Sequence, residues 1–105
     1  MGMQISHKFN DRWKIRQIAG DQALIGRPNS QESVDIDLSP DTSVSRRHAR
    51  IWVENAVHWV EDLKSKHGTL VNGKKLTGRI QIKAGDTIRI GETDLQIDNL
   101  PEESQ

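Results

Sequence analysis

Three short stretches of the sequence contain side chains that could do chemistry. Gly26-Arg27 ends the apolar run ALI, Ser45-Arg46-Arg47-His48 precedes the alternating run ARIWV, and Ser65-Lys66-His67-Gly68 precedes the run TLV. Cationic side chains beside hydroxyls and free backbone N–H groups bind anions, and the guanidinium fork of arginine matches the oxygens of a phosphate group. The three stretches therefore predict a local phosphate site.

Catalysis and metal binding are weaker interpretations of the same side chains. Ser45, His48 and Asp62 could be drawn as a nucleophilic triad, but no strained turn of the G-x-S-x-G kind presents the serine. The four histidines lack the close pairing that zinc sites use, and the chain has no cysteine. We therefore expect a binding protein without catalytic activity, metal or other cofactor.

The elements that must position these stretches are short strands. Apolar residues alternate with a period of two along much of the chain, which is typical of half-buried strands. The expected strands lie around residues 12–18, 23–26, 35–38, 51–53, 57–59, 69–71, 80–82, 88–90 and 95–97. Frequent turn formers between them favour an all-β sandwich or barrel with antiparallel sheets. Residues 12–99 would form this domain, and the polar segments 1–11 and 100–105 would be flexible tails.

The alternation also assigns side chains to the two faces of each strand. Trp59 is in phase with Val57 and is expected in the core, whereas Trp52 lies between Ile51 and Val53 and is expected to be partly exposed. The acidic segment 34–41 is expected to be a solvated edge strand and loop, whose charges discourage aggregation.

Length and charge restrict the class of protein. The chain has 105 residues, which suits one domain, and its 15 basic residues balance its 15 acidic residues. A neutral chain lacks the overall field that draws proteins onto nucleic acid or anionic lipid. No apolar run approaches the ~20 residues of a membrane span, and the lack of cysteine is compatible with a reducing compartment. We expect a soluble, cytoplasmic protein that binds neither nucleic acid nor membrane.

The order and spacing of the motifs resemble the forkhead-associated (FHA) domain. The family pattern runs Gly-Arg, Ser-Arg/Lys-x-His, Ser-x-Asn-Gly-Thr and Asn-Gly, and this chain reads GR at 26–27, SRRH at 45–48, SKHGT at 65–69 and NG at 72–73. Each motif is weakly specific, but the ordered set covers nearly the whole chain. The resemblance implies a sandwich of two twisted, mainly antiparallel sheets whose loops at one end bind phosphothreonine peptides in signalling.

The resemblance also implies roles for individual residues. The residues expected to bind the phosphate are Arg27, Ser45, Arg46 and Lys66. The residues expected to contact the peptide are Ser65, His67 and Arg47. The residues expected to support the site are Gly26, His48, Gly68, Thr69 and Asn72. The implied partner is a phosphothreonine-containing protein or peptide, such as a Ser/Thr kinase or a substrate of one.

Two positions depart from the family pattern. His67 stands where members usually place an asparagine that hydrogen-bonds the peptide backbone, and imidazole cannot supply the paired donor and acceptor of an amide. Lys66 stands where many members have a small hydroxyl residue, and its ammonium could reach the phosphate instead. Two alternatives stay open: a domain of this fold that docks unphosphorylated partners through another face, and a β-domain that binds polyanions or nucleic acid.

Overall fold

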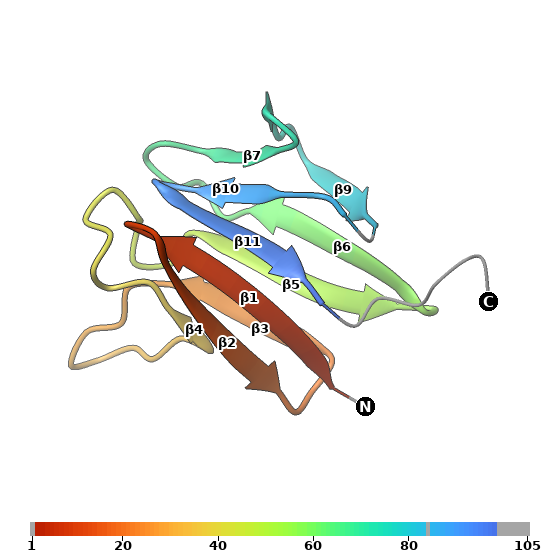
Figure 1. The fold of residues 1–105 in the computed structure, drawn as a ribbon, viewed down its shortest axis with the longest axis horizontal. Coiled ribbons are helices and arrows are strands. Elements are labelled where there is room, and N and C mark those ends of the chain that lie inside the picture. Colours follow the sequence, from red (N-terminus) through yellow and green to blue (C-terminus); the bar gives the residue numbers. More distant parts are fainter. Residues whose placement is uncertain (1, 84, 99–105) are drawn as a thin grey trace.

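Two β-sheets packed face to face make up the fold in the computed structural model, which describes residues 2–83 and 85–98 (Figure 1). The order of strands in the first sheet is β2 (Arg12–Ile18), β1 (Met3–Phe9), β11 (Thr93–Ile97), β10 (Ile88–Ile90), β7 (Thr69–Val71) and β8 (Lys74–Lys75). The order in the second sheet is β4 (Ile36–Asp37), β3 (Gln22–Gly26), β5 (Ala49–Glu54), β6 (Val57–Asp62) and β9 (Arg79–Ile82). Paired strands are antiparallel except β3 and β4, which are parallel.

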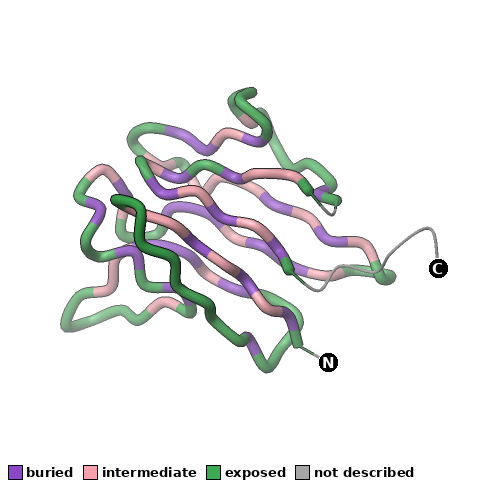
Figure 2. Tube along the Cα trace, viewed as in Figure 1, coloured by how far each residue is buried: buried purple, intermediate pink, exposed green. Residues whose placement is uncertain are grey.

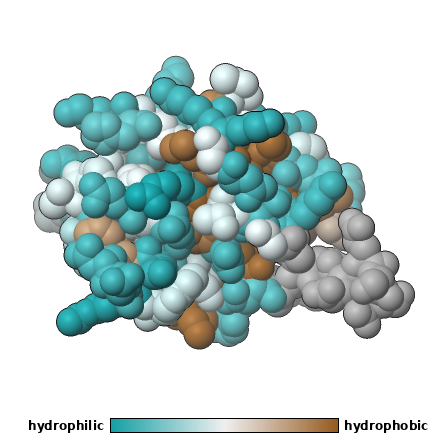
Figure 3. Space-filling model, turned by 45° about the horizontal axis from the view of Figure 1, so that its top comes forward, coloured by the Kyte–Doolittle hydropathy of each residue, from teal (hydrophilic) through white to brown (hydrophobic). Residues whose placement is uncertain are grey.

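The predicted all-β sandwich is confirmed. The inward side chains of both sheets form one core, in which Ile5 and Leu95 of the first sheet and Ile51 and Val60 of the second are fully buried. On the face drawn in Figure 3 hydrophilic side chains predominate, and hydrophobic ones appear as small separate patches. Over the residues that the structure describes, no helix is long and apolar enough to cross a membrane.

The N-terminal segment differs from the flexible tail expected over residues 1–11. Met3–Phe9 forms β1, an interior strand paired with both β2 and β11. Its inward side chains, those of Met3, Ile5 and His7, are all buried. Because His7 is polar, the alternation of apolar residues in this segment is too weak to identify a strand. Hydrogen-bonded pairing with β2 and β11 stabilises the strand instead. The expected tail is therefore corrected over residues 3–9, and the tail expected over 100–105 lies outside the described residues.

The two tryptophans of β5 and β6 lie opposite each other on the outer face of the second sheet. The prediction that Trp59 belongs to the core is wrong, since it is half-buried with the Arg79 guanidinium 4.9 Å from its ring centroid. Trp52 is only 8 % exposed, because Arg50 stacks over its ring at 4.2 Å. Cation–π contacts with arginine thus shield aromatic rings that stand outside the core.

The loops that carry the predicted site gather at one end of the sandwich. The β3–β4, β4–β5 and β6–β7 connections all lie at the left of Figure 1. They contain residues 27–35, 38–48 and 63–68, so each of the three motif stretches reaches this end. The sandwich therefore brings together segments that are far apart along the chain.

Three buried histidines make the stability of this fold depend on pH. Burial is the main cause that lowers the pKa of His7, His48 and His58 below the ordinary value. His58 is the clearest case, because its Nδ1 is buried and has no hydrogen-bond partner. In the unfolded chain a histidine titrates near pH ~6.5, so the unfolded state takes up protons first as the pH falls. Folding stability should therefore decrease below about pH 6.5.

Urea unfolding at about pH 7.5 and about pH 5 measures this decrease. We expect a lower midpoint at the acidic pH, and a smaller difference between the two pH values in His58→Leu, which removes one of the three groups. Asp41 and Asp62, whose pKa values are lowered, would add a loss only at more acidic pH, near and below about pH 4. An identical wild-type midpoint at both pH values would contradict the prediction.

Candidate functional site

Gly26 ends β3 where the β4–β5 loop passes directly over its backbone. A Cβ atom on Gly26 would lie 1.9 Å from the carbonyl oxygen of Arg46 and 3.0 Å from that of Ser45. The Arg27 N–H donates to the same Arg46 oxygen at 3.1 Å. The absence of a side chain at Gly26 therefore lets the loop that bears Ser45 and Arg46 rest against the end of β3.

Arg27 is oriented by a hydrogen bond of its own side chain. Its Nε donates to the carbonyl oxygen of Val44, the residue before Ser45. The side chain is half-buried, whereas Arg46 and Arg47 are exposed. Because Nε is already used, the two terminal amino groups of the planar guanidinium are the donors that Arg27 can offer to a ligand.

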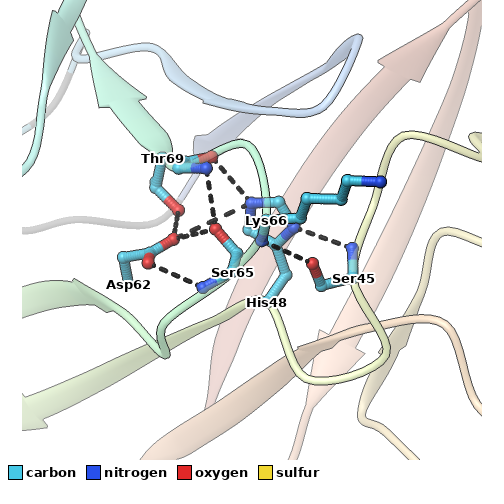
Figure 4. A network of polar contacts seen from close by, with 7 residues as sticks. Ser45, His48, Asp62, Ser65, Lys66 and Thr69 are labelled. Atoms are coloured by element: carbon cyan, nitrogen blue, oxygen red, sulfur yellow. Dashed lines mark hydrogen bonds and ion pairs between the residues drawn. The ribbon is translucent and has the colours of Figure 1, made fainter.

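His48 connects the β4–β5 loop to the β6–β7 loop (Figure 4). The Ser45 N–H donates to its Nδ1 at 3.0 Å, and its Nε2 donates to the Gly68 carbonyl oxygen at 2.8 Å. These partners require a neutral ring with the proton on Nε2. Burial lowers the pKa of His48 and outweighs the opposing effects of the Gly68 carbonyl and the Asp62 carboxylate. His48 therefore holds both loops as an uncharged link.

Ser45 and Lys66 meet where these two loops face each other. The Lys66 N–H donates to Ser45 Oγ at 3.0 Å, and since Oγ acts there as the acceptor, its hydrogen can still be donated to a ligand. The exposed Lys66 side chain extends away from the buried network on the side of Ser45 (Figure 4). Together with Arg27, these residues place a hydroxyl, an ammonium and a guanidinium around the same pair of loops.

Asp62 organises the β6–β7 loop from the end of β6. Its carboxylate accepts hydrogen bonds from the Ser65 N–H at 2.9 Å, from the Ser65 hydroxyl, and from the Thr69 hydroxyl at 2.7 Å. Burial alone would raise the pKa of Asp62, but the hydrogen bonds from Ser65 and Thr69 outweigh burial and lower the pKa. Asp62 is therefore a charged anchor for the loop.

The same network gives Ser65 a position that differs from the expected peptide contact. The Ser65 hydroxyl donates to Asp62 and accepts the Gly68 N–H at 2.8 Å, so it faces the protein. Gly68 has a φ of 83°, which a glycine adopts without strain, and this turns the chain back toward β7. The side chains that this loop exposes are those of Lys64, Lys66 and His67.

Asp41 anchors the β4–β5 loop on its other side, a role that the sequence does not predict. It is 2 % exposed, although it was expected in a solvated loop. Its Oδ2 accepts the Glu92 N–H and the Thr93 hydroxyl, both at 2.7 Å, and its Oδ1 accepts the Ser43 N–H at 3.0 Å. The spacing of Asp41 and Ser43 is typical of an Asx turn, but nothing local indicates the partners on the β10–β11 turn.

Asn72 lies apart from the phosphate loops, at the far end of β7. Its Nδ2 donates to Asp86 Oδ1 at 2.9 Å, and its Oδ1 accepts the Thr87 N–H at 3.0 Å. These bonds fix the β7–β8 turn against the segment that leads into β10. The side-chain hydrogen bonds of Asn72 therefore support this turn and not the loops of Ser45 and Arg27.

The side chains of Ser45 and His48 do not form a nucleophile–base pair at this end of the sandwich. The contact between Ser45 and His48 is made by the backbone N–H of Ser45, so its hydroxyl is not hydrogen-bonded to a base. Within residues 2–83 and 85–98, no group of three or more histidine, cysteine, aspartate or glutamate side chains could hold a metal ion. The geometry fits the capture of an anion.

Comparison with known sequences identifies relatives that contain the same domain. The family described as the FHA domain matches residues 23–91. FraH of Nostoc sp. is 38% identical over 76 residues, which cover 68% of this chain and 26% of FraH. The FHA domain-containing protein FhaB of Mycobacterium tuberculosis is 34% identical over 74 residues, which cover 70% of this chain and 45% of FhaB. The chain therefore spans less than half the length of these two relatives.

Comparison with solved structures gives the same result. An FHA domain from a structural and functional analysis of phosphothreonine-dependent FHA domain interactions superposes with a TM-score of 0.79 and 28% identity, covering 97% of this chain and 100% of that chain. Mycobacterium tuberculosis EmbR, solved in complex with a low-affinity phosphopeptide, superposes with a TM-score of 0.72 and 26% identity, covering 92% of this chain and 24% of EmbR. With its ordered motifs, its two sheets and a family match over most of its length, the chain belongs to the FHA domain family.

Proposed function

We propose that this chain is a non-catalytic module that binds proteins through a phosphorylated threonine. The observation that carries the proposal is the junction of the β4–β5 and β6–β7 loops, where Lys66 is bonded to Ser45 through its N–H and Arg27 is bonded to the neighbouring Val44 carbonyl. Support also comes from a structural neighbour studied for phosphothreonine-dependent interactions and from another solved with a phosphopeptide.

The proposed mechanism is electrostatic capture followed by peptide alignment. A phosphothreonine carries a charge of about −1.5 to −2 near neutral pH and three acceptor oxygens. The terminal amino groups of Arg27 and the hydroxyl of Ser45 donate to these oxygens, while Lys66 and Arg46 add positive charge. The peptide lies extended along the exposed loops beside His67 and Arg47. The partner is a phosphorylated protein in a signalling process, such as a Ser/Thr kinase or a substrate of one.

The direct test is fluorescence anisotropy with three labelled degenerate peptide pools of matched sequence. The pools have phosphothreonine, phosphoserine or threonine at the fixed position. Binding of the phosphothreonine pool alone would support the proposal. Equal binding of the unphosphorylated pool would favour docking through another face, and a steep loss of binding with salt, equal for phosphothreonine and phosphoserine, would favour a general polyanion site.

The two adjacent exposed arginines offer a matched pair of variants. The carbonyl oxygen of Arg46 is bonded to the Arg27 N–H, so residue 46 is held beside the proposed phosphate position. Arg47 follows Arg46 in the same bend, one residue farther along the loop, and we place its side chain farther from the phosphate. We expect Arg46→Ala to weaken binding of the phosphothreonine pool about fivefold to tenfold, and Arg47→Ala less than about twofold. A larger loss in Arg47→Ala than in Arg46→Ala, measured by the same anisotropy assay, would reverse this assignment.

A further inference from the structure

Strand β2 is exposed along almost its entire length. It pairs with β1 on one side and forms the edge of its sheet on the other. Every residue from 12 to 17 is exposed on both faces of the sheet, and Figure 2 shows this strand in green beside the largely buried β1. Natural edge strands are commonly short or covered, because their free backbone groups can pair with another chain. A long, uncovered edge is therefore a feature that needs an explanation.

The β1–β2 turn determines which backbone groups of β2 face the open edge. Asn10 and Asp11 have φ values of 53° and 62°, the conformation of a two-residue type I′ turn. In such a hairpin the residues that flank the turn, here Phe9 and Arg12, form a hydrogen-bonded pair, and bonded and non-bonded pairs then alternate. The N–H and C=O groups of residues 13, 15 and 17 consequently point away from β1. The edge offers a regular row of unused donors and acceptors.

The side chains of β2 are arranged opposite to the usual pattern of a sandwich. Lys14 and Arg16 lie across from His7 and Ile5, so the basic side chains occupy the inward face. Trp13 and Ile15 lie on the outward face, where they are 54% and 65% exposed. Of the large hydrophobic side chains exposed in the described part of the chain, only Ile80 lies elsewhere.

A cleft runs along the inward face of this edge strand. Two adjoining hollows of about 460 and 450 Å³ share Lys14, and Arg12 and Arg16 extend the basic lining in either direction. Arg16 donates to the carbonyl oxygen of Asp35 at 3.0 Å, whereas Arg12 and Lys14 form no ion pair with any described residue. The cleft therefore contains basic groups without a charged partner.

Three aspartates, Asp35, Asp37 and Asp41, line the opposite wall of the cleft, and each accepts backbone hydrogen bonds from residues outside β2. Asp35 Oδ2 accepts the Leu24 N–H at 2.8 Å, and Asp37 Oδ1 accepts the Ser39 N–H at 2.8 Å. All three lie in the segment between β3 and β5, not on the edge strand. The side chains directly next to an added strand would therefore be the basic ones of β2 on one face and the apolar ones on the other.

We propose that β2 is a docking edge for an extended acidic segment of a partner protein. The segment adds to β2 as an antiparallel strand, and its backbone pairs with residues 13, 15 and 17. Alternate acidic side chains point into the cleft toward Arg12, Lys14 and Arg16, and the intervening apolar side chains cover Trp13 and Ile15. Main-chain bonds would provide affinity and the alternating charges would set the register.

Charge decides between this partner and a second copy of the chain. Antiparallel pairing of two β2 strands would place Arg12, Lys14 and Arg16 of one copy beside the same three residues of the other. Like charges that face each other across a strand pair are destabilising, and β2 from residue 12 to residue 18 contains no acidic residue. Basic side chains thus discourage self-pairing and favour an acidic strand.

Amide hydrogen exchange followed by NMR tests the proposal at the level of single residues. The probe is a short blocked peptide that alternates glutamate and valine. The first control is a peptide that alternates lysine and valine. The second control contains the same glutamates and valines in two separate blocks. The expected result is slower exchange at residues 13, 15 and 17 with the alternating acidic probe only. Exchange that does not change at these amides, or that changes equally with the lysine–valine peptide, would overturn the proposal.

Anisotropy with the labelled acidic probe gives a second measurement on variants. Ile15→Pro removes an N–H that β1 does not use, and proline is tolerated at such edge positions, so binding should be lost while the fold is kept. Lys14→Glu should weaken binding at least about fivefold, whereas Lys74→Glu, the same change on β8 at the other edge of the sheet, should not.

An equal loss of affinity for the acidic probe in Lys14→Glu and Lys74→Glu would mean that only the overall charge of the chain matters, and it would overturn the proposal. Arg27→Ala should bind the acidic probe as the wild type does, because the proposed phosphate site is not involved. Sedimentation of the chain alone tests whether a second copy of the chain occupies this edge. A dimer that Ile15→Pro abolishes would show that β2 pairs with itself and would also overturn the proposal.

Discussion

Replacing Gly26 with alanine is expected to be among the most damaging single changes in this chain. The new Cβ would stand 1.9 Å from the Arg46 carbonyl oxygen and 2.7 Å from its carbon, and both atoms belong to the backbone. The β4–β5 loop would have to move away from β3, which would break the bond from the Arg27 N–H to the Arg46 oxygen. We expect a loss of about 3 kcal/mol of folding stability, or a decrease in Tm of about 10 to 20 °C.

Gly20→Ala is the matched control, because a Cβ atom at Gly20 would have nothing within 4 Å. Calorimetry should give this variant the Tm of the wild type. In Gly26→Ala, phosphothreonine binding should be lost even at temperatures where the chain is still folded, since Arg27 and Ser45 would be separated. A Gly26→Ala variant with wild-type stability and affinity would mean that the loop can rise from β3 without consequence.

Most strands could be predicted from the sequence because their inward positions are apolar. The end of β3 and the strand around Ile88 and Ile90 fall where the alternation placed them. Strand β2 was also located by its alternation, although its apolar residues Trp13 and Ile15 are exposed. The strand at 3–9 was missed because His7 occupies an inward position and the neighbouring outward residues give little contrast. The pattern detects burial of apolar side chains, and it fails where a polar side chain is buried instead.

Strand β6 shows a second limit of prediction from the alternating pattern, because the pattern does not tell which face of the strand is buried. Trp59 alternates with Val57, and His58 alternates with Val60, so both faces of the strand contain an apolar residue. In the structure His58 and Val60 face the core, and Trp59 lies outside under Arg79. Arg79, from another strand, stacks over Trp59 in this position, and no local pattern contains that information.

The sequence pointed to the motifs of the candidate site and to some of its supports, such as Gly26 and His48, but not to its two carboxylate anchors. The order of the motifs pointed to Arg27, Ser45 and Lys66, and the folded chain links the three loops that carry them by hydrogen bonds. Asp41 and Asp62 were not identified as supports, because their role depends on donors that only the fold places near them. Thr93, which donates to Asp41, is 52 positions away along the chain.

Replacing Arg27 with alanine is expected to have the largest effect on ligand binding. If the terminal amino groups of Arg27 donate to the phosphate, their removal costs the worth of at least one hydrogen bond to a charged group, about 1.5 to 3 kcal/mol. That cost corresponds to a roughly tenfold to 150-fold higher Kd for a phosphothreonine peptide, measured by anisotropy or calorimetry. The unphosphorylated peptide should bind the wild type and the variant equally weakly.

Arg27→Lys separates charge from geometry in this prediction. Lysine keeps the positive charge, but its three donors share one nitrogen, so it lacks the planar fork that places Nε at the Val44 carbonyl and the terminal amino groups at the ligand. Its affinity should therefore fall between those of the wild type and Arg27→Ala, with the Tm of the three proteins used to exclude unfolding. If Arg27→Lys binds as weakly as Arg27→Ala, the fork geometry outweighs the charge. If folded Arg27→Ala keeps the wild-type Kd, the phosphate is not held by Arg27, and the proposed mechanism fails.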